Sequence, residues 1–451
     1  MNAAPSAVAR KPARRWGAGS FTRALPIEAG TLLLAIIVSG LLVRVFIAGI
    51  EMPRSGYAID IGDFTIWGQR MAASGPGAFY AGGGLADYPP GYMYVLWALG
   101  GIGKVLEPVV GINITAGLVK IPPILADAGV AWLLFTMGRR FLGEHLGDLR
   151  AEQVGLAAAA IYMFNPGVIF DSTVWGQVDS VGTLAVLATI YFLARGWTEA
   201  AAAGAVIALL IKFQFAFIIP VVLVVGLKRH LFGRSADPSQ ADRPDLLRIL
   251  TSLAAGLGTT VLLIAPFGLS IWSPGDATTC SCLWGRFVSA ASTYSGLSIN
   301  AFNLWMNPFS GLAGGPDTPV APSLQWGSDQ TVVATIGSFV VTWQFVGIAL
   351  FVAVAAAALW VVLRRDDAMG LLVASLLLAV AFFALPTRVH ERYLFPALAI
   401  GALLVMRDRR WAVAYGLISL CFFANVYGIY TADWSFYQGT VLNPGVGGVA
   451  M

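Results

Sequence analysis

Residues 331–363 read TVVATIGSFVVTWQFVGIALFVAVAAAALWVVL, a long apolar run. Lipid cannot satisfy backbone N–H and C=O groups, so segments that cross a membrane are helices or closed barrels. Continuous runs of about 20 or more apolar residues favour helices. Further long runs lie at about 28–49, 113–137, 154–170, 247–270, 368–385 and 411–430, and shorter ones at 91–106, 180–195, 199–212, 213–227 and 394–406. The sequence therefore predicts an all-α polytopic membrane protein.

The composition of the whole chain excludes the other broad classes. Of the 451 residues, 57% are hydrophobic and 12% are charged, against roughly a quarter charged in an average soluble domain. A soluble fold of this length would lack the polar residues for its surface, and a disordered chain would be less apolar. The three cysteines are too few for a disulfide framework.

The basic residues indicate the orientation, because cytoplasmic loops collect Lys and Arg. The net charge of +4 could suggest nucleic acid, but most basic residues gather in short segments between apolar runs. The basic residues therefore indicate the orientation of the chain in the membrane, and the sequence predicts no nucleic-acid partner. These segments are the tail 1–27 and the stretches 139–150, 195, 228–248, 364–365 and 407–410.

One conflict concerns the run at 91–106. If it crossed the membrane, the basic stretch 139–150 and the loop 171–179 would fall on the wrong sides. It follows Tyr88-Pro89-Pro90 and is short, which suits a re-entrant or interfacial helix. We therefore expect about 11 spans (10–13), an inside N-terminus and an outside C-terminus. The alternative is 12 spans with one misplaced basic loop.

This topology divides the chain into a basic cytoplasmic tail, one transmembrane domain and an outside tail. The boundaries are 1–27, 28–430 and 431–451, and the outside loops within the domain are 50–112, with its interfacial helices, 171–179, 271–330 and 386–396.

Acidic residues gather in three of the outside loops. A carboxylate at a membrane edge carries a desolvation cost, so it is a functional candidate by default. Three such groups on one face predict a cavity there. They are Asp60, Asp63 and Asp87 in the first loop, Asp171 and Asp179 in the second, and Glu391 beside His390 and Arg392 in the last.

Each group also has a simpler interpretation. Asp60 and Asp63 could cap an interfacial helix, and Asp179 could be an N-cap. The turn Arg388–Arg392 could pair internally, or its charges could bind an anionic phosphate. Lys212 could snorkel to the interface, although its expected place near the outside face favours a counter-ion for an anionic ligand.

Several motifs together resemble a known group of membrane enzymes. Asp60 lies on a helix that runs to Trp67, and Asp87-Tyr88-Pro89-Pro90 opens another helix, as in GT-C-fold glycosyltransferases that use polyprenyl-phosphate sugars. The stretches Val174–Ser180, Leu297–Trp305 and His390–Pro396 are similar to bacterial relatives of the GPI-anchor mannosyltransferases. The Asp-Tyr-Pro-Pro element also resembles lipid-linked glucosyltransferases of asparagine-linked glycan assembly. The resemblance runs from about residue 30 to 430.

The resemblance implies transfer of a hexose, with mannose the first choice, from a polyprenyl-phosphate carrier to an acceptor hydroxyl. The acceptor would be a glycolipid, a polysaccharide or a protein. Asp60 would be the catalytic base, with Asp63 as its neighbour, and inversion would follow from single displacement. The donor phosphate would meet Lys212, Arg388, His390 and Arg392. Sugar and acceptor would meet Asp87, Tyr88, Asp171, Trp175, Gln177, Asp179 and Glu391.

We expect no metal and no cofactor, and an active site on the extracytoplasmic face of the cell membrane. Two other classes remain open. A transporter or flippase of lipid-linked sugars would also carry interior charges and broken helices. A non-catalytic membrane subunit of polysaccharide assembly would make Asp60→Asn silent.

Overall fold

The computed structural model describes residues 28–51, 56–81, 86, 88–235, 244–273, 281–305 and 328–441. The basic tail 1–27 and Asp87 lie outside the described residues. The helices are α1 (Ala29–Glu51), α2 (Ala58–Ser74), α3 (Pro90–Val110), α4 (Thr115–Leu118), α5 (Ile121–Leu146), α6 (Asp148–Met163), α7 (Pro166–Ile169), α8 (Asp179–Ala194), α9 (Thr198–Ile211), α10 (Ile219–Gly226), α11 (Leu246–Ile264), α12 (Leu283–Thr293), α14 (Trp343–Arg364), α15 (Ala368–Ala384), α16 (Phe395–Ala402) and α17 (Arg409–Val441). Two strands, β1 (Val332–Ile336) and β2 (Phe339–Thr342), form one antiparallel hairpin.

The class of all-α polytopic membrane protein is confirmed. Among the described residues, seven helices are long and apolar enough to cross a membrane, or eight if the pair Arg150–Met163 and Pro166–Trp175, bent by 49°, is one span. Three shorter apolar helices accompany them, namely Asp179–Ala194, Thr198–Ile211 and Ala368–Ala384. The count of 11 spans stays a prediction.

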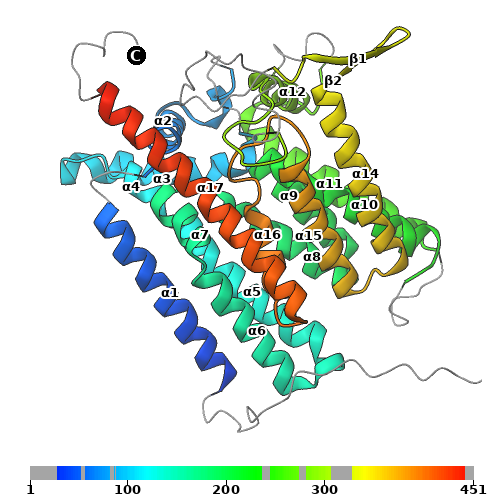
Figure 1. The fold of residues 1–451 in the computed structure, drawn as a ribbon. Coiled ribbons are helices and arrows are strands. Elements are labelled where there is room, and N and C mark those ends of the chain that lie inside the picture. The colour runs from blue at the N-terminus through cyan, green and yellow to red at the C-terminus, as the bar shows by residue number, and fades with distance from the viewer. Residues whose placement is uncertain are drawn as a thin grey trace, which may run out of the picture.

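The predicted re-entrant segment is longer in the structure than the sequence suggested. The helix α3 has 21 residues and by itself meets the length and hydropathy of a span. In Figure 1, however, α3 runs at a steep angle to α1 and lies near the same end of the bundle as α2. A close approach joins the two helices, because a Cβ on Gly100 would clash with the backbone of Gly68 and a Cβ on Gly68 would clash with the carbonyl of Leu96.

The run 331–363 is only partly helical, which differs from the single long span expected. Its first part forms the hairpin β1–β2, and the helix α14 begins at Trp343. Twenty-two residues of α14 already suffice to cross a bilayer. The β-branched residues before them favour strands, and Gly337 supplies a positive φ of 64° at the turn.

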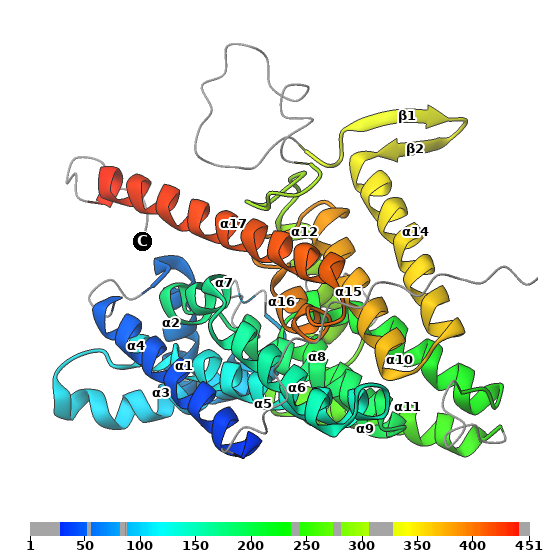
Figure 2. The same ribbon diagram turned by 60° about the horizontal axis from the view of Figure 1, so that its bottom comes forward.

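The interior of the bundle is built by α5, α6, α8 and α16, and all eight residues of α16 are buried. Lipid-facing helices surround it, with α1, α11 and α14 largely exposed along their spans (Figure 2). A buried ion pair fixes α1 to this interior: Arg44 Nε donates to Asp127 Oδ2 at 2.8 Å. Asp127 Oδ1 also accepts from the hydroxyls of Tyr162 and Ser180, so the buried charge is compensated.

One of the described cysteines is cross-linked. Cys282 is disulfide-bonded and lies just before α12. Cys280 lies outside the described residues, and Cys421 has a free thiol.

Candidate functional site

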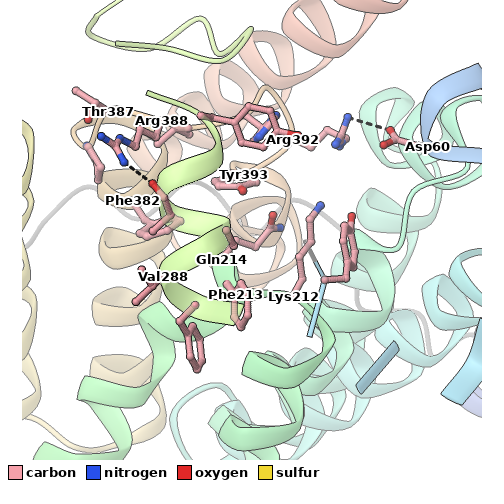
Figure 3. A pocket seen from close by; sticks show the side chains of 18 of the residues that line it. Asp60, Lys212, Phe213, Gln214, Val288, Phe382, Thr387, Arg388, Arg392 and Tyr393 are labelled. Carbon is pink, nitrogen blue, oxygen red and sulfur yellow. Dashed lines mark hydrogen bonds and ion pairs between the residues drawn. The ribbon is translucent and has the colours of Figure 1, made fainter. Parts of the chain in front are cut away.

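A cavity of about 520 Å³ lies at the end of the bundle that carries α2, α12 and the loop 386–394. Figure 3 shows Arg392 pointing toward Asp60 across it, with Lys212 and Gln214 on one wall. Phe213 and Val288 form an apolar side. The first and last predicted loops therefore meet at one cavity, together with α12 and residues 212–214, whereas no residue of the second loop, 171–179, lines it.

Asp60 stands at the centre of this arrangement. It lies in the first turn of α2, and its Oδ2 accepts a hydrogen bond from Trp175 Nε1 at 2.6 Å. The same oxygen is 3.3 Å from Arg392 Nη1. Trp175 itself is buried, stacks on Tyr57 and lies under the Arg392 guanidinium at 4.8 Å. These contacts join the first, second and last loops.

The charge on Asp60 is stabilised by its neighbours. Burial alone raises the pKa of its carboxyl. The Arg392 charge, hydrogen bonds from Trp175 and Gln177 and the Lys212 charge together bring that pKa below its ordinary value of 3.8. A general base works best with a pKa near the operating pH. This carboxylate is therefore a weak base held in an ion pair.

The second loop is shaped by a cap and a π-helical turn. The Asn165 side chain accepts hydrogen bonds from the first backbone amides of α7. The turn Phe170–Trp175 follows and ends at Gly176, whose φ of 89° suits glycine. This irregular path places Asp179 in the first turn of α8, inside the bundle.

Lys212 is held by Asp179. The helix α9 ends at Ile211, and the backbone of the next residue, Lys212, is extended. Its Nζ donates to Asp179 Oδ1 at 2.9 Å, and Gln214 Nε2 donates to the same oxygen at 2.8 Å. The Lys212 ammonium also lies 5.5 Å from the ring centre of Tyr88 and 5.7 Å from that of Tyr393. The predicted cation is thus present at the cavity but already carries a carboxylate partner.

Arg392 is surrounded by carboxylates. Its Nη1 contacts Glu391 Oε1 as well as Asp60, and its Nε lies 3.8 Å from Asp179 Oδ2. Within the described residues, Arg392 Nε, Asp179 Oδ2 and Glu391 Oε2 are buried without a hydrogen-bond partner. Buried polar groups usually have one, so this cluster retains unused hydrogen-bonding capacity.

Arg388 is placed differently from the other predicted cations. It lines the cavity, but one edge of its guanidinium binds both carboxylate oxygens of Asp329, through Nε at 2.6 Å and Nη2 at 3.0 Å. Thr387 also donates to Asp329. This bidentate pair is strong and directional. Arg388 thus acts in shaping the loop, where its own φ is 64°.

The surroundings of His390 disfavour the positive charge that phosphate binding would need. Burial, with the charges of Arg392 and Lys212, lowers the pKa of its imidazole to about 3. The ring packs edge-on against Tyr294, and the backbone pairs with Ile299 and Asn300. The role of His390 in binding phosphate stays a prediction, and the half-buried position of the ring near Arg392 and Lys212 disfavours its charged form.

The remaining predicted residues divide between the cavity and the protein behind it. Asp63 and Tyr88 line the cavity. The Tyr88 hydroxyl donates to Gln177 Oε1 at 3.2 Å. Asp171 is fully buried and does not line the cavity, and neither of its carboxylate oxygens has a hydrogen-bond partner among the described residues.

Two parts of the chain that support the last loop were not recognised in the sequence. Asp329, in the loop 271–330, was not singled out, because nothing near it in the chain indicates that Arg388 is its partner. The segment Leu297–Trp305 was noted only for its resemblance. In the structure, Ile299 N donates to Val389 O at 3.0 Å and Trp305 Nε1 donates to Leu385 O at 2.7 Å. This segment therefore holds the last loop in place.

The fold and site define a polytopic α-helical membrane protein with a polar cavity at one end. Comparison with known families adds a second finding: residues 78–280 match the family described as GPI transamidase subunit PIG-U. The matched region runs from before α3 to beyond α11 and includes Tyr88, Asp179 and Lys212, but not Asp60 or the loop 386–396. No curated protein matches the chain.

This finding corrects the predicted activity. The matched family is described as a subunit of a transamidase, and nothing in that description involves hexose transfer. The prediction of a hexosyltransferase that takes mannose from a polyprenyl phosphate is wrong, and with it falls the role of Asp60 as catalytic base. The multi-pass membrane location is retained.

Proposed function

We propose that this chain is a non-catalytic membrane subunit that binds the head group of a glycosylated phospholipid in its cavity. It would act within an assembly that processes lipid-linked glycans. GPI denotes a glycosylated phospholipid, and the matched family is described as a subunit. The observation that carries the proposal is the cavity itself, in which aromatic rings lie beside Asp60 and Arg392 and the Nε of Arg392 makes no hydrogen bond within the described residues.

The size and lining of the cavity suit a head group. Its volume of about 520 Å³ lies within the range of roughly 300–1,000 Å³ for small-molecule sites. Trp67, Tyr88 and Tyr393 line it together with Asp60 and Arg392. Flat rings can stack on sugar faces, while carboxylates accept hydrogen bonds from sugar hydroxyls. The apolar side near Phe213 would let a lipid tail leave toward the bilayer.

Arg392 is the group best placed to meet the phosphate. Lys212 and Arg388 each hold a short ion pair, so neither is readily released. Arg392 is also paired with Glu391, but its contact with Asp60 is a longer 3.3 Å, and its Nε makes no hydrogen bond within the described part of the chain. A phosphate oxygen can therefore replace Asp60 as its partner at a smaller cost than at the other two cations.

The charges at the far end of α14 indicate which side of the membrane the cavity faces. The cavity includes Gln344, at the first turn of α14, while the basic pair Arg364 and Arg365 lies at the last turn of that helix. Basic ends of spans face the cytoplasm. The cavity would therefore open on the extracytoplasmic face.

Binding of a fluorescent glycosylated phosphatidylinositol to the chain in nanodiscs tests this function. Arg392→Gln should weaken binding at least about tenfold, in the range for a lost hydrogen bond to a charged group. Arg248→Gln is the matched control, because Arg248 pairs with Glu199 away from the cavity. Equal affinity of wild type and Arg392→Gln, with both proteins folded, would remove the proposed function.

A further inference from the structure

The hairpin β1–β2 presents apolar side chains to its surroundings. No charged residue occurs between Thr331 and Leu363, and every residue of β1 is exposed. Ile336 is 71% exposed. A single two-stranded hairpin is marginally stable in water, so its environment must contribute to its stability.

One face of the hairpin is apolar throughout. Ala334 pairs with Val341, and Ile336 pairs with Phe339. Residues directly opposite in an antiparallel pair lie on the same face, as do residues two apart. These four residues form what we call the apolar hairpin face. The opposite face carries the pair Thr335 and Val340 and is more polar.

The apolar hairpin face continues into the lipid-facing side of α14. The rings of Phe339 and Phe345 are 5.0 Å apart. Phe345, Ile348 and Val352 are spaced i, i+3 and i+7, so they lie along one side of the helix, and all three are exposed. Because α14 is apolar enough to cross a membrane and mostly unburied, this side faces lipid.

We propose that the hairpin lies on the bilayer surface, with the apolar hairpin face turned toward the lipid that surrounds α14. The continuity of the two apolar surfaces selects lipid over a protein partner. The strand edges carry unpaired N–H and C=O groups, which the hydrocarbon interior could not satisfy but the hydrated interface can.

The base of the hairpin is connected to the cavity. Gln344 N donates to Asp329 O at 2.9 Å, and Trp343 N donates to Thr331 O at 3.3 Å. Asp329 in turn binds Arg388 in the cavity wall, while Gln344 lines the cavity. A hairpin fixed at the lipid surface would hold the cavity mouth at head-group depth. This consequence rests on the proposed function, whereas the placement of the hairpin does not.

Depth-dependent quenching in lipid nanodiscs tests the placement. In the full chain with Cys421→Ala, Ile336→Cys and Thr335→Cys would each be labelled with an environment-sensitive fluorophore. The label at 336 should be quenched several-fold more strongly by spin-labelled lipid, and the label at 335 more strongly by aqueous iodide. Phe339→Cys and Val340→Cys repeat the comparison on the second strand.

Two outcomes would overturn this placement. Iodide could reach both faces equally in nanodiscs, which would leave the hairpin in water. Alternatively, position 336 could be protected in native membranes but exposed in nanodiscs of the purified chain, which would assign the face to a protein partner. Neither measurement uses a glycolipid, so failure here is separate from failure of the proposed function.

Discussion

The two ends of the molecule use similar charged residues in different ways. At the end away from the cavity, Asp366 accepts from Lys228 Nζ at 2.7 Å and Arg229 Nε at 2.6 Å. Arg229 also donates to the carbonyls of Leu193 and Asp366. At the cavity, Arg392 meets three carboxylates, yet its Nε and two carboxylate oxygens lack hydrogen bonds within the described residues.

This difference separates a structural network from a binding site. A buried network whose members are all satisfied rigidifies the fold. A network beside a cavity that retains unused donors and acceptors can gain hydrogen bonds when a ligand arrives. Substitutions at four positions test this difference between the two ends.

The largest effect is expected for Asp366→Ala. Removing it leaves Lys228 and Arg229 buried without their carboxylate, which should lower the free energy of unfolding by about 3–5 kcal/mol. Thermal unfolding in detergent measures this change. Asp367→Ala is the neighbouring control, since its carboxylate only caps α15 and meets Arg365 at the surface, and should cost about 1 kcal/mol. Equal losses would contradict the structural role of Asp366.

A pH dependence is expected from His390. Its pKa is about 3 in the folded chain and 6.5 ordinarily, so the unfolded chain binds the extra proton between these values. Stability therefore rises with pH across this window and is fully present above it. At pH about 5 the free energy of unfolding of the wild type should be about 2 kcal/mol lower than at a pH above 6.5 because of this group. Unfolding of His390→Gln should show a correspondingly weaker dependence, and an unchanged pH profile would mean that His390 titrates normally.

Asp60→Asn should strengthen glycolipid binding. The amide can still accept from Trp175, but the carboxylate that competes with phosphate for Arg392 is gone. We expect a gain of about 1 kcal/mol, the upper range for a partly exposed ion pair. Titration in nanodiscs measures the affinity, with Asp63→Asn as control at the cavity rim. Weaker binding by Asp60→Asn would show that the carboxylate itself contacts the ligand.

The smallest effect is expected for Tyr88→Phe. The ring near Lys212 is kept, and only the hydroxyl that donates to Gln177 is lost. A neutral hydrogen bond contributes about 1 kcal/mol, so affinity should fall less than tenfold. The affinity of Tyr88→Ala, which also lacks the ring, should fall further. Equal losses from both variants would exclude stacking on this ring.

The sequence predicted the features that depend on local pattern and general membrane physics. Long apolar runs indicated the helical class, and the acidic residues of the first loop indicated one wall of the cavity. Non-local pairings could not be predicted. Asp329 meets Arg388 across 59 positions of chain, and the pKa of His390 is lowered by burial and by cations that are distant in the sequence. The hairpin could not be distinguished in the sequence because its residues are as apolar as those of the span that follows.

Photo-cross-linking tests the central claim most directly. A glycosylated phosphatidylinositol with a diazirine on its head group would be irradiated with the chain in nanodiscs, and the adducts would be mapped by mass spectrometry. If the head group binds in the cavity, adducts should form in α2 near Trp67, at Lys212–Gln214 and in the loop 386–394, and excess unlabelled lipid should abolish them. Adducts confined to the lipid-facing helices α1 and α11 would contradict binding in the cavity.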